Sequence, residues 1–469
     1  MKNSEKAVSL LNFNILPKVM RTLLTLAVIF LSLCSAAQPV KVELAERDGR
    51  HVLLRGGEEY YIKGAGGSGH LDLLVQIGGN SIRTWSVDDT RKILDEAHAK
   101  GLTVMAGLWV GHERHGFDYD NEAAVRKQYE RFEAAVKELK DHPAILLWGV
   151  GNEVDLFYSN TKVWHAVQDI AAMIHRVDPN HPTTTVTAGL DSMEVHLIKT
   201  RAPDIDILSV NTYGDLHHVP GNVRKWGWTG PYMISEWGPN GHWEVAKAQW
   251  GAPIEQSSEE KARSYRARYV EHIESKRSDG MIGSYVFLWG QKQETTETWY
   301  GLFDAQGRPT RAIDMMELNW KGALPLDETP VLESLTLSGN EVIPGSNMYY
   351  ADDLITASLK ASDKKERKLE VQWILVPEAT NTKAGGDAES ALSAVTGQFR
   401  NKGTDGVTVV VPRAEGGYRV FVKVIDQQGR VAYANIPFYS YPRPVGADQR
   451  QWVRWGSRSM DEFGFDPAE

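Results

Sequence analysis

Residues Ala144–Glu153 have the sequence AILLWGVGNE, an almost unbroken apolar run that ends in an asparagine and a glutamate. A strand that is apolar on both faces is typical of a parallel sheet that helices cover on each side. A glutamate at the end of such a strand is costly to bury unless it is paired or takes part in chemistry. This segment therefore predicts a parallel α/β architecture and a carboxyl group with a function.

Seven more apolar runs flank this segment, and polar stretches with helical spacing separate them. The runs are Tyr60–Gly66, Ser81–Ser86, Leu102–Val110, Thr183–Ala188, Asp206–Tyr213, Tyr232–Trp237 and Gly283–Trp289. Amphipathic helices are predicted at Asp89–Lys100, Asn121–Lys140, Thr161–Val177, Ser257–Arg277 and Arg311–Leu318. Eight strand–helix units within residues 38–322 favour a (β/α)8 TIM barrel over a doubly wound sheet.

The composition changes after Gly322. Short strands that alternate apolar and polar residues follow one another up to Pro442, with no long helical pattern between them. This pattern predicts an immunoglobulin-like β-sandwich at residues 323–445, in which Trp373 belongs to the core. Thr380–Asp405 is polar and predicts a long loop within it. Residues 446–469 form a C-terminal tail whose aromatic residues we expect to pack against the barrel.

The first 37 residues resemble an export signal. Basic residues precede the apolar run Leu23–Leu33, namely Lys2, Lys6, Lys18 and Arg21, and the small residues Ser35–Ala37 follow it. This arrangement predicts a signal peptide of residues 1–37 and a secreted or periplasmic bacterial protein. Acylation of Cys34, as in an outer-membrane lipoprotein, is the alternative, although Leu33 stands where a small residue is usual. Met20 could equally be the true start.

Composition narrows the classes of partner. The chain has 52 Lys and Arg against 61 Asp and Glu, a net charge of −9, which becomes −12 when the four basic and one acidic residues of positions 1–37 are removed. An acidic protein has little with which to neutralise phosphates, so we exclude nucleic acid as the partner. The single cysteine excludes a disulfide framework and cysteine-rich metal sites. The 15 tryptophans are unusual and point to stacking on sugars.

Two glutamates stand at strand ends. Glu153 ends the fourth predicted strand, and Glu236, in the sequence YMISEWG, ends the seventh. In a (β/α)8 barrel these ends meet at the face that carries the active site. Glycoside hydrolysis needs such a pair, one carboxyl to protonate the leaving oxygen and one to attack the anomeric carbon. A buried, salt-bridged pair of glutamates is the structural alternative.

This constellation resembles glycoside hydrolase clan A, the retaining barrel glycosidases. Asn152-Glu153 is similar to the Asn-Glu pair of the clan's fourth strand. The resemblance implies that Glu153 is the general acid/base, that Asn152 binds the 2-hydroxyl group of the sugar, and that Glu236 is the nucleophile. It covers roughly residues 50–322, with its motifs confined to the strand ends.

Three more residues match the clan's pattern on other strands. Arg83 corresponds to the arginine that lies beside the nucleophile, and a cation there keeps a carboxylate ionised. Tyr213 corresponds to the tyrosine that donates a hydrogen bond to the nucleophile. Trp289 corresponds to the tryptophan that forms the floor of the sugar site. The resemblance therefore implies that all three contact the substrate or the reacting carboxylate.

Further substrate contacts are predicted from residue type and position. Trp109, Trp237 and Trp299 lie at strand ends or in the following loops and are candidates to stack on sugars, whereas Trp148, Trp164 and Trp320 are assigned to the core. The loop after the third strand offers His112, Glu113 and His115 as hydrogen-bonding residues. Its sequence HERH lacks the spacing of a zinc motif, and its acidic residues lack the pattern of an EF-hand, so we predict no metal and no cofactor.

The expected substrate is a neutral polysaccharide. The barrel begins almost at the predicted mature N-terminus, so we expect an enzyme unlike the large exo-acting β-galactosidases and β-glucuronidases, whose barrel follows sandwich domains. A barrel followed by an immunoglobulin-like domain is similar to bacterial endo-β-1,3-glucanases of glycoside hydrolase family 158. A β-mannanase, a β-1,4-glucanase, a transglycosylase and a non-catalytic carbohydrate-binding barrel are the alternatives. We expect a monomer without a membrane span.

Overall fold

The computed structural model describes residues 39–443, and its centre is a closed barrel of eight parallel strands. The strands are β4 (Ile62–Gly66), β5 (Ser81–Arg83), β6 (Thr103–Leu108), β7 (Ile145–Val150), β8 (Thr183–Ala188), β9 (Ile207–Asn211), β10 (Tyr232–Trp237) and β11 (Met281–Val286). Each lies within or overlaps one of the eight predicted runs, which confirms the TIM barrel. The predicted signal peptide, with Cys34, and the tail 446–469 lie outside the described residues.

A helix follows each barrel strand. The helices are α2 (Leu71–Gln76), α3 (Thr90–Ala99), α4 (Glu122–Leu139), α5 (Val163–Val177), α6 (Ser192–Arg201), α7 (Val219–Lys225), α8 (Ser258–Arg268) and α9 (Arg311–Lys321). Ser257 and Glu260 form a reciprocal capping box that fixes the start of α8. The single helix predicted at Ser257–Arg277 changes type instead, because a π-helical turn and a 3-10 turn succeed α8 over Tyr269–Asp279.

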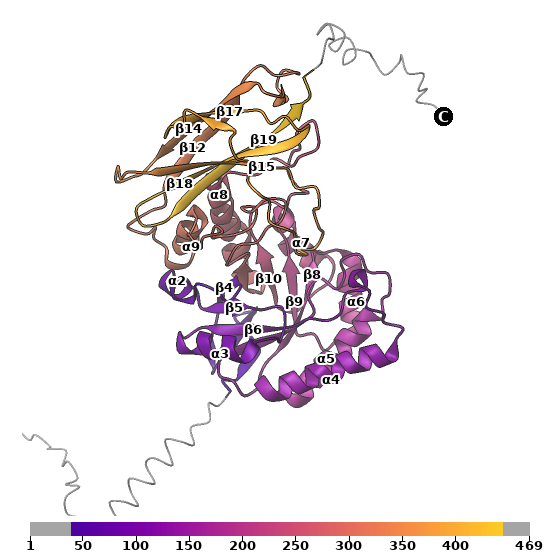
Figure 1. The fold of residues 1–469 in the computed structure, drawn as a ribbon. Coiled ribbons are helices and arrows are strands. Elements are labelled where there is room, and N and C mark those ends of the chain that lie inside the picture. Colours follow the sequence, from indigo (N-terminus) through magenta and orange to yellow (C-terminus); the bar gives the residue numbers. More distant parts are fainter. Residues whose placement is uncertain (1–38, 444–469) are drawn as a thin grey trace, which may run out of the picture.

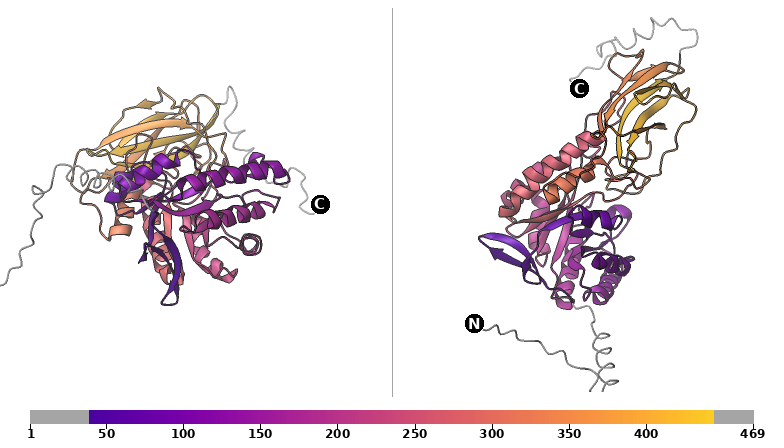
Figure 2. Two further views of the ribbon diagram at one scale, coloured as in Figure 1. Left: turned by 90° about the horizontal axis from the view of Figure 1, so that it is seen from below. Right: turned by 90° about the vertical axis from the view of Figure 1, so that its left-hand side faces the viewer.

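A small antiparallel sheet that the sequence analysis did not identify precedes the barrel. It consists of β1 (Val42–Arg47), β2 (Arg50–Arg55) and β3 (Glu58–Glu59). Val42 and Leu53 belong to the same buried cluster as Ile62 and Met233 of the barrel strands. This sheet lies on the side of the barrel away from the sandwich (Figure 2), so it covers the end opposite to the strand ends that carry the two glutamates.

Two four-stranded sheets form the C-terminal sandwich, as predicted. One contains β12 (Val331–Ser338), β14 (Leu354–Ser362), β17 (Gly406–Val410) and β16 (Phe399–Arg400), and the other β13 (Met348–Tyr350), β19 (Val431–Tyr441), β18 (Gly416–Ile425) and β15 (Glu370–Pro377). Trp373 is buried in the core between the sheets, as expected. β13 and β19 pair in parallel.

The sandwich packs against the barrel beside α8 and α9 (Figure 1). Buried polar groups join the two domains. Lys261 of α8 is paired with Glu255, whose other carboxyl oxygen accepts a hydrogen bond from Asn435 of β19. Tyr433 of β19 donates to the carbonyl of Thr298 in the loop after β11. Buried polar groups that are fully paired fix one relative orientation of two surfaces. No helix within residues 39–443 is long and apolar enough to cross a membrane.

Candidate active site

The chain turns sharply where β7 ends, and this turn presents Glu153. Gly151 has a φ of 81°, and a Cβ atom there would lie 2.9 Å from Val154, so the turn requires glycine. Glu153 itself has a φ of 51°, and its backbone N–H donates to the carbonyl of Val186 in β8. A non-glycine residue in the left-handed region is strained, and such strain is concentrated at functional sites.

Glu236 lies near the end of β10 and is almost completely buried, with 5% of its surface exposed. Arg83 and the indole N–H of Trp85 donate to one carboxyl oxygen over 3.0 and 2.8 Å. The hydroxyl of Tyr213 donates to the other oxygen over 3.1 Å. The contacts of Arg83 and Tyr213 agree with the expectation, and three donors of this kind stabilise a charged carboxylate.

Trp85, which stacks beneath the guanidinium of Arg83, reaches Glu236 because two barrel segments approach each other closely. A Cβ atom on Gly107 of β6 would lie 2.6 Å from the Cα atom of Trp85. Only a residue without a side chain therefore fits opposite Trp85. Trp85 lies within the predicted run Ser81–Ser86, but the sequence analysis gave it no contact with Glu236.

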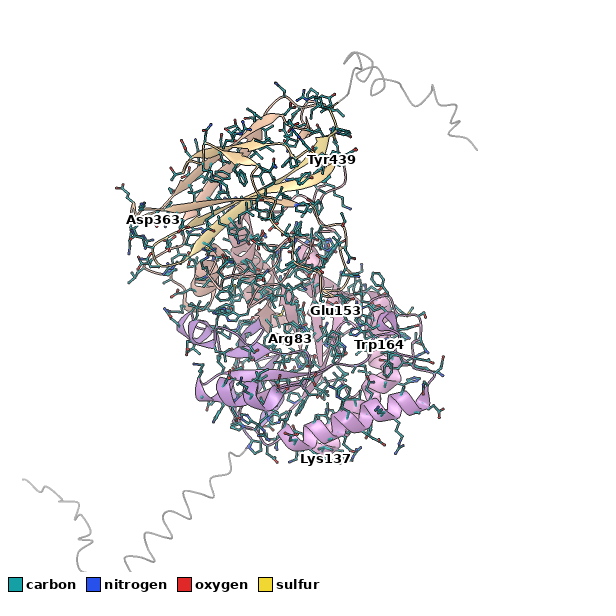
Figure 3. All side chains as sticks on the ribbon, in the orientation of Figure 1. Arg83, Lys137, Glu153, Trp164, Asp363 and Tyr439 are labelled. Carbon is teal, nitrogen blue, oxygen red and sulfur yellow. The ribbon has the colours of Figure 1, made fainter. Side chains whose placement is uncertain are left out.

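Asn211, at the end of β9, connects the two glutamates, and sequence analysis missed it. Its amide nitrogen donates to Glu153 over 2.8 Å and to the side-chain oxygen of Asn152 over 3.1 Å. Its own oxygen accepts from Arg83 over 3.1 Å. Because Arg83 also donates to the oxygen of Asn152, that oxygen is occupied and the amide nitrogen of Asn152 remains to donate to a ligand. Figure 3 labels Glu153 and Arg83 close together in the barrel domain, with Glu153 nearer the sandwich in this view.

The two carboxyl groups differ in their electrostatic surroundings. Desolvation, together with the charge of Glu236, raises the pKa of Glu153 to about 7, although the hydrogen bond from Asn211 and the charge of Arg83 act in the opposite direction. Glu236 has a cation and two further donors, whereas Glu153 accepts one neutral amide. The donors around Glu236 thus stabilise a carboxylate, and the raised pKa of Glu153 favours its protonated form.

Both glutamates line a cleft of about 850 Å³. Aromatic residues contribute much of its wall, namely Trp85, Trp109, Phe157, Tyr213, Trp243 and Phe287. Trp243, 57% exposed, meets the ring of Tyr213 edge-on. Exposed rings beside hydroxyl and carboxyl groups suit sugars, whose C–H faces stack and whose hydroxyls hydrogen-bond. The lining of the cleft includes Trp109, as expected.

Three predicted substrate contacts, those of Trp237, Trp289 and Trp299, are wrong. All three side chains are at most 1% exposed, and none lines the cleft. Trp237 packs on Tyr265 and Tyr269 behind β10, and Trp289 meets Phe303 edge-on. They belong to the core, as Trp148, Trp164 and Trp320 do in agreement with prediction. Phe287, just after the end of β11, lines the cleft instead.

The three polar residues predicted in the loop after β6 have structural partners and do not line the cleft. His112 is buried, and its Nε2 lies 2.5 Å from the carbonyl of Asn152, which it helps to position. Glu113 accepts from the hydroxyl of Ser159 and from two backbone N–H groups. His115 pairs with Asp387 of the sandwich. The structure therefore places none of the three in the cleft, and their assignment to substrate binding is corrected because each contacts other groups of the protein instead.

Metal ligation has no candidate in the described part of the chain. No group of three or more His, Cys, Asp or Glu side chains in residues 39–443 is placed to hold an ion. The acidic residues of the loop after β6 instead bind lysine and backbone groups, as Asp120 does with Lys162. The chemistry of the cleft is therefore considered through its carboxyl groups.

Comparison with known proteins agrees with this geometry. A parallel eight-stranded barrel with two glutamates at its strand ends is the arrangement that glycoside hydrolysis needs. Residues 70–322 match the family described as glycosyl hydrolases family 2, TIM barrel domain. Because the match covers more than half of the chain, the protein belongs to this family, which supports the predicted clan A.

The relatives of known function are β-glucuronidases. That of Sus scrofa is 22% identical over 288 residues, 57% of this chain and 42% of the relative, and that of Felis catus is 23% identical over 271 residues, 53% and 40%. The chain thus spans less than half the length of these relatives. The structure of β-D-glucuronidase from Dictyoglomus thermophilum is 17% identical with a TM-score of 0.47, covering 60% of this chain and 54% of that one. Sequence analysis had set this group apart from the chain on its domain order.

Proposed function

We propose that the protein cleaves β-glycosidic bonds by double displacement, with Glu236 as the nucleophile and Glu153 as the general acid/base. The observation that supports these roles is the unequal surroundings of the two carboxyl groups. Glu236 accepts hydrogen bonds from Arg83, Trp85 and Tyr213, which favour the anion needed for attack. The raised pKa of Glu153, about 7, favours the protonated form needed in a general acid.

In the first step, a carboxylate oxygen of Glu236 attacks the anomeric carbon while the bond to the leaving oxygen breaks. Glu153 gives that oxygen its proton, and the sugar remains as an ester of Glu236. The ester removes the charge of Glu236, so the pKa of Glu153 falls and it can accept a proton from water. That water attacks the anomeric carbon and frees Glu236. The amide nitrogen of Asn152 donates to the 2-hydroxyl of the sugar during both steps.

We propose a neutral β-linked glycan as the substrate. The cleft wall contains five carboxyl groups, those of Glu153, Asp215, Glu236, Glu244 and Glu294, and two lysines. One of these lysines, Lys292, is already paired with Glu294. A uronic acid would therefore bring its carboxylate into a site with an excess of negative charge and only Lys383 to receive it. β-Glucuronide hydrolysis, the activity of the named relatives, is the alternative.

Within neutral glycans, our first candidate is a β-1,3-glucan cut internally. It is supported by the likeness of the barrel-and-sandwich architecture to endo-β-1,3-glucanases and by the aromatic wall of the cleft. A β-mannan, a β-1,4-glucan, and transfer to a sugar instead of water are alternatives at the same site. A protein that binds sugar without cutting it is the alternative of another class. We also propose export from the bacterial cytoplasm, which rests on residues 1–37 and their basic, apolar and small segments.

Product analysis tests this proposal. The purified protein is incubated with laminarin, β-mannan, cellulose-type β-glucan and an aryl β-glucuronide, and the first product is followed by proton NMR. We expect the neutral β-glucans to be cut and the newly formed reducing end to appear first as the β-anomer, since two inversions retain configuration. A first product with the α-anomer would exclude double displacement. Faster cleavage of the glucuronide than of every neutral glycan would replace the proposed substrate class.

A further inference from the structure

We propose that a loop of the C-terminal sandwich forms part of the substrate site and binds a sugar unit next to the one that is cleaved. This inference rests on the proposed glycosidase function. The loop, residues 378–389, follows β15 and is called here the bridging loop. Thr382–Gly386 of this loop line the same cleft as Glu153 and Glu236. The binding site is therefore built from both domains, although the two glutamates come from the barrel alone.

Arg114, which follows β6 of the barrel, holds the tip of the bridging loop. Its guanidinium donates to Asp387 over 2.8 Å and lies 3.4 Å from the carbonyl oxygens of Ala384 and Gly385. His115 lies 3.0 Å from the same carboxylate. The Arg114 side chain is 9% exposed and that of Asp387 is 34% exposed, so this ion pair is partly shielded from solvent. The contact is built in the manner of an interface that persists in solution.

A second set of contacts holds the bridging loop to the segment after β11. Glu389 accepts from the backbone N–H of Thr295 over 2.7 Å and from the N–H of Lys383 over 2.9 Å. Lys292 donates to the carbonyl of Gly386 over 3.3 Å. The bridging loop is thus fixed to two barrel loops, one after β6 and one after β11. Those strands are separated in the barrel by β4 and β5, so the bridging loop spans part of the barrel mouth.

Two glycines allow the close approach. Gly385 and Gly386 have φ values of 61° and 70°, and a Cβ atom on Gly385 would lie 2.6 Å from Leu156 and 2.8 Å from Arg114. A side chain at this position would push the bridging loop away from the barrel. No residue of the bridging loop belongs to the hydrophobic core of the barrel or of the sandwich. The close approach of this loop to the barrel instead places polar residues in the cleft.

The bridging loop presents hydrogen-bonding groups of the kind that sugars need. Thr382, which carries a hydroxyl group, and Lys383, which carries an ammonium group, both line the cleft. The aromatic residues of the same cleft can stack on a pyranose. Among the described residues, no hydrogen bond joins the bridging loop to Glu153 or Glu236. The bridging loop is thus assigned to a sugar next to the one attacked, because the loop lines the cleft without contacting either carboxyl group. The substrate is therefore an oligosaccharide or polysaccharide of at least two or three sugar units. The contact with the bridging loop contributes to the affinity for this chain.

The test compares Asp387→Ala with a matched control, Asp352→Ala. Asp352 lies in the same domain and forms an ion pair with Arg413 over 3.0 Å, but both side chains are more than half exposed. Loss of the Arg114 and His115 contacts should raise KM for a laminari-oligosaccharide about tenfold. The kcat value for a short aryl β-glycoside should stay within about twofold, because the carboxyl groups are untouched. Asp352→Ala should change neither value by more than about twofold.

A second variant separates loss of binding from loss of folding. Lys383→Ala removes an exposed side chain whose loss leaves the docking contacts intact, and it should raise KM for the oligosaccharide with kcat unchanged. As a readout independent of activity, trypsin should cleave after Lys383 faster in Asp387→Ala than in the wild type, and the oligosaccharide should slow the cleavage.

The outcomes distinguish this inference from the proposed function. If the wild type cleaves no glycoside, the proposed function fails. If the wild type is active but Asp387→Ala and Lys383→Ala match Asp352→Ala on both long and short substrates, the role of the bridging loop is rejected. Equal losses on short and long substrates would also reject it, because they would indicate general disruption of the site.

Discussion

The ends of β7 and β10 both present a glutamate to the same cleft, yet they surround it differently. The end of β10 buries Glu236 among a cation, an indole N–H and a phenol hydroxyl. The end of β7 bends through a left-handed residue and leaves Glu153 with a single amide donor, Asn211. Two identical side chains therefore differ in their surroundings: three donors stabilise a carboxylate at Glu236, whereas desolvation and the charge of Glu236 raise the pKa of Glu153.

The same comparison shows how the site is connected. Arg83 donates to Glu236 and to Asn152, and Asn211 accepts from Arg83 while donating to Glu153. The two carboxyl groups are thus connected by hydrogen bonds through Arg83 and Asn211, and the charge of Glu236 also acts directly on Glu153. Lower activity alone does not show which glutamate is the nucleophile and which is the general acid/base. The two roles are distinguished by experiments in which variants of Glu236 and Glu153 give different products.

The largest effect is expected from loss of the nucleophile. Glu236→Ala should reduce the activity on every glycoside by at least about 10³-fold, because no covalent intermediate can form. Azide can fit the space left by the side chain and attack the anomeric carbon directly. This single inversion of a β-glycoside should give the α-glycosyl azide, identified by NMR. As the control, Glu333→Ala on the surface of the sandwich should keep full activity. Full activity in Glu236→Ala would discard the assignment of both glutamates.

Loss of the general acid/base, Glu153, should reduce activity less than loss of Glu236. It should also give the glycosyl azide of the opposite anomeric configuration. Glu153→Ala should slow substrates with poor leaving groups by roughly 10²- to 10⁴-fold, but substrates whose leaving group needs no proton much less. With such an activated substrate the ester on Glu236 still forms, and azide should then attack it to give the β-glycosyl azide after two inversions. The measurement is the ratio of kcat/KM values for two aryl glycosides of different leaving-group acidity. If Glu153→Ala gave the α-azide, the two roles would be reversed.

Much of the barrel and of the reacting centre could be predicted from the sequence, because buried parallel strands leave continuous apolar runs. A charged residue at the end of such a run is conspicuous and marks Glu153 and Glu236, whereas Arg83 was predicted from the family resemblance. Asn211 could have been noticed in the same way, since it lies near the end of the sixth apolar run, Asp206–Tyr213. Its role was missed because an asparagine is less conspicuous than a charge, although its position predicts the same cleft.

The error at Trp237 has a simple physical cause. Successive side chains of a strand point to opposite faces, so Glu236 and Trp237 cannot both face the cleft. Trp237 lies on the helix side, between Tyr265 and Tyr269. The contacts of Arg114 and His115 with Asp387 join residues more than 270 positions apart, and no local pattern marks such a contact. The N-terminal sheet was missed because its short strands are only partly buried.

The smallest effect is on pH dependence, and it tests the cause of the raised pKa of Glu153. Glu153 must be protonated for the first step, so kcat/KM for a poor leaving group should fall as the pH rises through about 7. Because the charge of Glu236 contributes to this raised pKa, the pKa of Glu153 should be lower in Glu236→Gln, measured by carbon NMR of labelled glutamate.

Glu194 provides the control: its pKa is also raised to about 7, by desolvation and its contact with Asp191, but it lies in α6 and does not line the cleft. Glu194→Gln should therefore leave the pH profile unchanged. Suppose that the pH dependence of kcat/KM shifted in Glu194→Gln but not in Glu236→Gln. The group whose protonation controls the reaction would then not be Glu153, and the different surroundings of the glutamates at the ends of β7 and β10 would have another function.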